Sequence, residues 1–191
     1  DGGVVAAAPP VEEKFRVDYA ASPYRINRLS LDFQLGETET VVTCEMNVTP
    51  QSGAGSADLV LDGEDLELRS IMLDGAVLNP ESYILAADTL TLLDPPSDRS
   101  FSLKTVVAIV PQANTQLSGL YVSNDMYVTQ CEAEGFRRIT YFQDRPDVMA
   151  TYDVRIEADR EKYPVLLSNG NAIDGGDAGN GRHWASFSDP F

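Results

Sequence analysis

The segment TQCEAEGFRRITYFQDRPDV, residues 129–148, gathers polar side chains whose types and spacing could bind a ligand. Gln130 and Glu132 directly follow the run DMYVT, which we expect to be a strand, and rigid scaffolds commonly hold binding groups at such exits. Glu132 supplies an anionic acceptor, and Gln130 supplies both a donor and an acceptor. Residues two apart in extended backbone point to the same side, so this pair could grip an ammonium group and a neighbouring amide.

The same segment also allows a purely structural interpretation. Glu132 could be an exposed carboxylate that lies near Arg137 or Arg138. The sequence DRPD, residues 144–147, has the pattern of a turn that its own charges fix, with the proline opening a short helix. On the residues alone, both interpretations of Glu132 stay open.

The sequence contains few residues that could support metal catalysis or nucleophilic catalysis. Catalytic zinc usually needs three protein ligands, but the chain has one histidine, His183, and no HExxH motif. A Ser–His–acid triad would need the same histidine, and no GxSxG motif accompanies it. The glycine-rich DGGDAGNG, residues 174–181, is expected to be a loose loop between two strands. We therefore predict no catalytic residue and no metal ligand within this chain.

The net charge and the cysteine content of the chain limit which partners and which cellular compartment we expect. The chain carries 14 Lys and Arg against 30 Asp and Glu, a net charge of −16, so nucleic acid and anionic membrane surfaces are excluded as expected partners. No apolar run approaches the ~20 residues of a membrane helix. Cys44 and Cys131 lie far apart in the sequence and are expected to be free thiols, which favours an intracellular compartment, either cytoplasmic or organellar.

Alternating apolar and polar residues dominate from residue 24 onward and predict a mainly β fold. We expect a flexible tail over residues 1–14 and a β-rich domain over 15–191, with about a dozen short strands in more than one sheet. One or two short helices at most are expected, near 132–138 and 145–150. The expected strands lie near 24–35, 40–48, 58–61, 66–73, 76–78, 83–86, 89–93, 101–110, 151–159 and 163–169. In addition, residues 119–130 are expected to form two short strands around Ser123-Asn124-Asp125, and residues 172–187 a hairpin closed by a loop.

Longer motifs carry a resemblance to a known family. The run GLYVSNDMYVTQCEAEGFRRITYFQDRPDVMATY, preceded by PQANTQLSGLY and followed by KYPVLLSNGN and NGRHWASFSDPF, resembles the N-terminal domain of the aminopeptidase N family of zinc metallopeptidases. The bacterial and plastid-type alanyl aminopeptidases are the most similar members, and the similarity runs from about Phe15 to Phe191. The resemblance implies a saddle-like, multi-sheet β domain that precedes a thermolysin-like catalytic domain.

The resemblance also implies roles for residues in the segment 129–148. In the family, the Gln and Glu of QCEAEGF reach the catalytic cleft, and they correspond to Gln130 and Glu132. The Glu binds the substrate's α-ammonium group together with the acidic residue of a GAMEN segment, while the Gln shapes the pocket for the first side chain. The remaining charged residues are expected to brace the loop: Arg137, Arg138, Asp144, Arg145 and Asp147.

The family's catalytic groups are expected to lie outside this chain. Zinc is held by HExxH and a downstream Glu, and neither HExxH nor GAMEN occurs here. The chain alone is therefore expected to be inactive and free of zinc, whereas the full-length protein releases single residues from the N-terminus of peptides. Its expected partners are the peptide's amino terminus and the catalytic domain of the same polypeptide. The alternative function is a stand-alone, non-catalytic β binding module.

Overall fold

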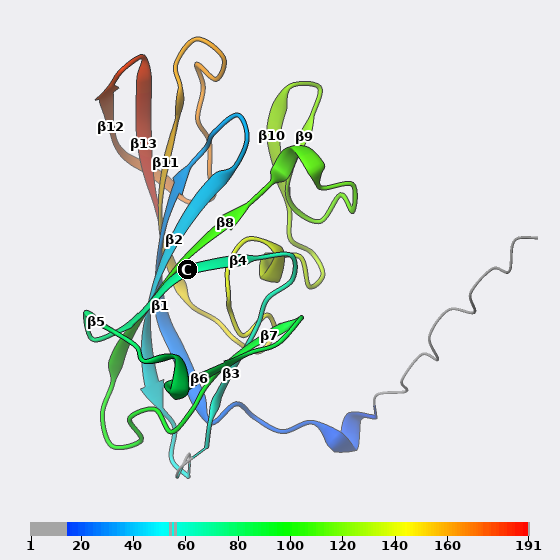
Figure 1. Cartoon of the computed structure of the whole chain (residues 1–191), viewed down its shortest axis with the longest axis vertical. Coiled ribbons are helices and arrows are strands. Elements are labelled where there is room, and N and C mark those ends of the chain that lie inside the picture. The colour runs from blue at the N-terminus through cyan, green and yellow to red at the C-terminus, as the bar shows by residue number, and fades with distance from the viewer. Residues whose placement is uncertain (1–14, 54, 56, 191) are drawn as a thin grey trace, which may run out of the picture.

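The computed structural model describes residues 15–53, 55 and 57–190. It confirms a mainly β fold, because thirteen strands form three sheets within the described residues (Figure 1). The expected tail, residues 1–14, lies outside them. The strands are β1 (Tyr24–Gln34), β2 (Thr40–Pro50), β3 (Leu59–Asp62), β4 (Glu67–Leu73), β5 (Ala76–Val77), β6 (Tyr83–Leu85), β7 (Thr89–Leu92), β8 (Phe101–Ile109), β9 (Gly119–Ser123), β10 (Met126–Gln130), β11 (Thr151–Asp159), β12 (Asn171–Gly179) and β13 (Arg182–Asp189).

The largest sheet has the strand order β12-β13-β11-β1-β2-β8-β4-β5. Its neighbours are antiparallel except for β1 and β11, which run parallel. A three-stranded sheet has the order β3-β7-β6, and β9 and β10 form a separate hairpin. In Figure 1 that hairpin stands beside the upper part of the large sheet, with β12 and β13 on the other side of the view.

The alternation of buried and exposed side chains in β1 is interrupted once, and a bulge explains the interruption. Ile26 and Leu29 are both fully buried although three positions separate them, which breaks the period of two. Ile26 pairs with Val48 of β2, whereas Arg28 pairs with Asn47, so Asn27 forms a bulge between them. A bulge adds one residue to one strand and restores the inward direction of the next apolar side chains.

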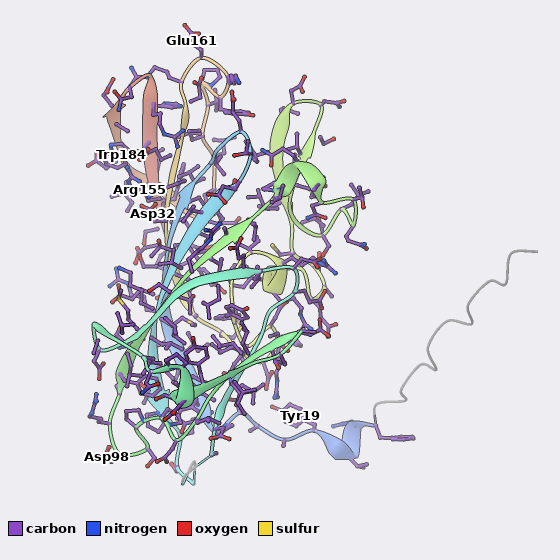
Figure 2. The ribbon with its side chains drawn as sticks, in the orientation of Figure 1. Tyr19, Asp32, Asp98, Arg155, Glu161 and Trp184 are labelled. Carbon is purple, nitrogen blue, oxygen red and sulfur yellow. The ribbon has the colours of Figure 1, made fainter. Side chains whose placement is uncertain are left out.

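The two faces of the large sheet differ in chemistry where β1 meets β11. On one face, Asp32 of β1 pairs with Arg155 of β11, with Nη1 and Oδ2 2.9 Å apart. The Arg155 guanidinium also lies 5.2 Å from the ring centre of Trp184, and Figure 2 shows these three residues in a row. The opposite face is apolar, and its residues from these two strands are Leu31, Phe33, Tyr152, Val154 and Ile156.

Three local predictions were wrong. Residues 163–169 are irregular rather than a strand, because β12 takes the place beside β13. The segment is held instead at its start, where Nε2 of His183 lies 2.7 Å from the Tyr163 carbonyl oxygen. The glycine-rich run begins inside β12 and reaches its turn only at Asn180 and Gly181, since Gly175 and Gly176 leave room for Trp184 of the paired strand.

The third wrong prediction concerns the helices. Residues 145–150 form a single turn, closed by a 3.1 Å hydrogen bond from the Val148 amide to the Arg145 carbonyl, and not a helix. The Arg145 side chain instead bonds Asp147. The helical segments of the described residues are four short 3-10 turns: η1 (Arg16–Asp18), η2 (Pro80–Ser82), η3 (Pro111–Ala113) and η4 (Phe136–Arg138).

Both cysteines are free thiols, as predicted. Cys44 is fully buried in β2, and burial raises the pKa of its thiol to about 12. An unfolded thiol titrates near pH ~8.5, so above that pH the unfolded state loses its proton while the folded state keeps it. The contribution of Cys44 to stability is therefore complete below about pH 8.5 and declines as the pH rises toward 12.

We expect the free energy of unfolding in urea to fall by up to about 1.4 kcal/mol per pH unit from Cys44 in that window. A Cys44→Ala variant should be less stable at neutral pH, because it leaves a cavity, yet its stability should fall less steeply with pH. Cys131, whose thiol pKa burial raises to about 11, remains in both proteins and cancels in the comparison. Equal slopes above pH 9 would contradict the assignment to Cys44.

Candidate binding loop after strand β10

The β9–β10 hairpin places the predicted binding residues. Asn124 and Asp125 make its turn with φ of 48° and 61°, a left-handed conformation that these two residue types tolerate. Gln130 is the last residue of β10 and pairs with Gly119 at the start of β9. The structure therefore places Gln130 at a strand exit, as expected, with Glu132 in the loop that follows.

That loop is a tight turn that leaves its tip exposed. The Gly135 amide donates a 2.9 Å hydrogen bond to the Cys131 carbonyl, and the side-chain amide of Gln130 donates a 3.0 Å bond to the Glu132 carbonyl. The peptide bond between Glu132 and Ala133 is cis. Gln130 and Glu132 are both exposed, and one N–H of the Gln130 side-chain amide holds the loop backbone. The second N–H and the Oε1 acceptor of that amide are not used by this bond.

Gly135 is needed where it stands because the loop closes tightly on it. A Cβ atom at this position would lie 2.6 Å from the Gln130 carbonyl oxygen and 2.8 Å from the Cys131 Cα. Backbone atoms cannot yield as a flexible side chain does, so a larger residue would push the loop away from the end of β10. A glycine at position 135 is therefore needed for the loop that carries Glu132 to close against Gln130 and Cys131.

Arg137 braces the loop through hydrogen bonds to Asp144. Its backbone N–H and its Nε both donate 3.1 Å hydrogen bonds to Oδ2 of Asp144, and its Nη2 donates a 3.0 Å bond to the Asp144 carbonyl. Although burial lowers the pKa of this guanidinium, the bond to Asp144 and the charge of Asp62 raise it above its usual value. The predicted bracing role of Arg137 and Asp144 is confirmed.

The other basic residues of the segment are also paired. Arg138 pairs with Glu64 and Asp65, each at 2.5 Å. Arg145 pairs with Asp147 at 2.8 Å, and its guanidinium stacks 5.3 Å from the ring centre of Tyr19, near the start of the described chain. These pairs connect the segment to the loop before β4 and to the N-terminal residues, so they serve the fold.

Glu132 is the exception among the acidic residues of this segment. Glu134 lies 3.8 Å from Arg137, while Asp144 and Asp147 have the partners given above. Within the part of the chain that the structure describes, no hydrogen bond or ion pair engages the Glu132 carboxylate. Glu132 is exposed, as the structural interpretation also expected. The ion pairs of Arg137 and Arg138 in the described residues are with other carboxylates, and whether Glu132 binds a ligand stays a prediction.

A large apolar cleft lies beside this hairpin. Its volume is about 860 Å³. One wall comes from β1 and β11, a second from the hairpin, where Tyr127, Thr129 and Cys131 line it, and a third from the irregular residues 163–169. Met126 of β10 also lines the cleft, whereas Val128 and Gln130 do not. The only earlier signal for the third wall was the apolar run YPVLL.

Neither the cleft nor the loop offers a metal site in the structure. Across residues 15–190, apart from the undescribed 54 and 56, no three His, Cys, Asp or Glu side chains gather as metal ligands would. No helix of this part of the chain is long and apolar enough to cross a membrane. What the loop offers chemically is a carboxylate without a partner among the described residues and an adjacent side-chain amide, on a braced turn.

Residues 21–191 match the family described as the peptidase M1 N-terminal domain. The chain belongs to this family. Aminopeptidase N of Caulobacter vibrioides is 48% identical over 174 residues, and that of Escherichia coli is 44% identical over 180. These alignments cover 91% and 94% of this chain but 20% of each relative. The M1 N-terminal domain thus spans about a fifth of the length of these relatives, and the family predicted from the sequence motifs is confirmed.

Solved structures agree with the M1 fold. The crystal structure of Legionella pneumophila aminopeptidase A in complex with aspartic acid has a TM-score of 0.87 at 33% identity, over 92% of this chain and 21% of that one. An M1 zinc metallopeptidase from Deinococcus radiodurans has a TM-score of 0.72 at 15% identity, over 88% of this chain and 39% of that one. At that lower identity the likeness supports the fold alone.

Proposed function

We propose that this chain is the N-terminal domain of a zinc-dependent aminopeptidase, and that Glu132 binds the α-ammonium group of the peptide substrate. The observation that carries the proposal is the exposed Glu132 carboxylate, which has no partner within the described part of the chain, on a loop whose other charges are paired. The membership in the M1 family and the relative solved with aspartic acid, an amino acid with a free α-amine, support it. They also favour it over a stand-alone binding module.

The chemistry of an aminopeptidase requires such a group. The enzyme must measure one residue from a charged amine, so a carboxylate at the closed end of its cleft fixes the register of the peptide. A charge-assisted hydrogen bond of this kind contributes about 1.5–3 kcal/mol. A closed end also prevents longer peptides from binding at an internal bond. Gln130 lies at the base of the same loop, and its Oε1 would help to shape the pocket for the first side chain.

The described residues do not fit the metal of the proposed enzyme. The described residues provide no ligand cluster, so we place the zinc ligands in another part of the polypeptide and derive no catalytic step here. Zinc would lower the pKa of a bound water and polarise the scissile carbonyl. The role of this domain is to bind and orient the amine.

The apolar cleft fits a second part of the proposal, the contact with a catalytic domain of the same polypeptide. Met126, Val165 and Leu167 line the cleft yet are 59%, 70% and 78% exposed. Apolar side chains gathered at this exposure mark interaction surfaces. Because Thr129 and Cys131 also line the cleft, a domain packed there would lie directly beside the loop that carries Glu132.

The activity of the complete protein tests this function. A longer polypeptide that contains this domain should release alanine from alanine p-nitroanilide. It should cleave the N-acetylated substrate at least about a hundredfold more slowly, because acetylation removes the positive charge that Glu132 binds. The N-methyl substrate, which keeps the charge, is the matched control. Similar rates with the free and acetylated substrates would refute an amine-binding role.

A further inference from the structure

The loop with Glu132 is anchored unusually firmly at its far end. Arg137 is bound to Asp144 through three hydrogen bonds of 3.0–3.1 Å, and its carbonyl accepts a 2.9 Å bond from the Glu64 amide. The Asp144 amide in turn donates a 2.9 Å bond to the carboxylate of Asp62, the last residue of β3. This Arg137–Asp144 clamp thus ties the loop to the three-stranded sheet.

The sheet that receives the clamp is a rigid support. Leu59 and Leu61 of β3 are fully buried in the core, and the amide and carbonyl of Asp62 exchange hydrogen bonds of 2.7 and 3.0 Å with Phe142. A turn anchored to such a strand has few alternative positions. At its near end the same turn is held by β10 and by the Gln130 side chain.

The clamp also reaches back toward the loop tip. The Arg137 side chain is 15% exposed, and its guanidinium lies 3.8 Å from the Glu134 carboxylate, two residues from Glu132. A planar guanidinium with its donors fixed on Asp144 keeps one orientation, whereas a lysine ammonium on a flexible stem would not. The guanidinium therefore restricts the loop tip through Glu134.

We infer that Arg137, through its clamp to Asp144, is a positioning residue that holds Glu132 where it binds the substrate's α-ammonium group. The inference rests on the proposed function. A carboxylate on a loose turn would lose its orientation toward the amine, and small misplacements of binding groups cost large factors in affinity. Arg137 itself does not touch the substrate.

Two inhibitors that differ only in the α-amine provide the test. The dissociation constants of alanine hydroxamate and propanehydroxamic acid are measured by calorimetry on the complete protein. The dissociation constant of propanehydroxamic acid divided by that of alanine hydroxamate is a ratio that reports on amine binding, whereas general damage to the active site would weaken both compounds alike. We expect Arg137→Met to lower the ratio at least about tenfold while the constant of propanehydroxamic acid changes less than about threefold. Arg137→Lys should recover part of the ratio, because it restores the charge and not the fork.

Three further variants complete the experiment. Asp144→Asn, which keeps the size of the side chain, should lower the ratio in the same direction and carries the test if Arg137→Met does not fold. Arg145→Met, which removes a paired guanidinium farther along the segment, should leave the ratio unchanged. Adding Arg137→Met to Glu132→Gln should produce no further loss, because residues that act through one group are not additive.

The outcomes separate the inference from the function on which it rests. If Glu132→Gln lowers the ratio but Arg137→Met and Asp144→Asn do not, the clamp has no positioning role and the proposed function stands. Equal losses for Arg145→Met and Arg137→Met would likewise overturn the inference. If Glu132→Gln leaves the ratio unchanged, the proposed amine-binding role of Glu132 fails, and the clamp has nothing to position.

Discussion

Replacing Glu132 by alanine should lower kcat/KM of the proposed full-length aminopeptidase by about two decades or more, which corresponds to roughly 3 kcal/mol of lost transition-state stabilisation. The side chain is exposed and forms no charge pair in the described chain, so its loss leaves no buried partner unsatisfied. The effect should therefore appear in kinetics and leave the thermal midpoint nearly unchanged. The measurement is hydrolysis of an aminoacyl arylamide at several substrate concentrations.

A matched control removes one negative charge from the other end of the same hairpin. Asp125 lies in the β9–β10 turn with φ of 61°, and asparagine tolerates that conformation. Asp125→Asn should keep kcat/KM within about threefold of the wild-type value. A Glu132→Ala enzyme that also stays within threefold would reject the binding role of Glu132.

The largest expected effect on stability is at Tyr24, the first residue of β1. Its side chain is 1% exposed, its hydroxyl donates a 2.7 Å hydrogen bond to the Ala57 carbonyl, and its ring meets Phe101 edge-on with centres 6.2 Å apart. Tyr24→Ala should lower the free energy of unfolding by about 3–5 kcal/mol, because it removes a buried ring and leaves a cavity. A loss of that size is a large share of the ~5–15 kcal/mol that stabilises a typical domain.

Tyr24→Phe separates the ring from its hydroxyl. It should cost only about 0.5–1.5 kcal/mol, the net value of one hydrogen bond, since the packing against Phe101 remains. Urea unfolding of the isolated chain, followed by circular dichroism, gives both values. The packing account of this end of β1 would be wrong if the alanine variant lost no more stability than the phenylalanine variant.

Local patterns in the sequence predicted most of the strands because burial on one face imposes a period of two. The turn at Asn124 and Asp125 was also predictable, since few residue types accept positive φ. The interrupted alternation between Ile26 and Leu29 could be seen in the sequence. Its cause could not, because the bulge depends on which residue of β2 lies opposite.

Features that depend on contacts distant in sequence were not predictable. β12 looked like a loop because its glycines disfavour strands, yet they accommodate Trp184 of the paired strand. Residues 163–169 have the composition of a strand, but β12 occupies the position beside β13. For the candidate loop, the sequence indicated which charged residues could pair. Only the fold shows that Arg137 pairs with Asp144 and that the Glu132 carboxylate has no partner among the described residues.

The most direct measurement is a crystal structure of the complete protein with a bound amino acid or amine-bearing inhibitor. The account predicts a carboxylate oxygen of Glu132 about 2.7–2.9 Å from the α-nitrogen of the ligand, a charge-assisted hydrogen bond. A structure in which that carboxylate points away from the bound amine, while other groups hold the nitrogen, would contradict it.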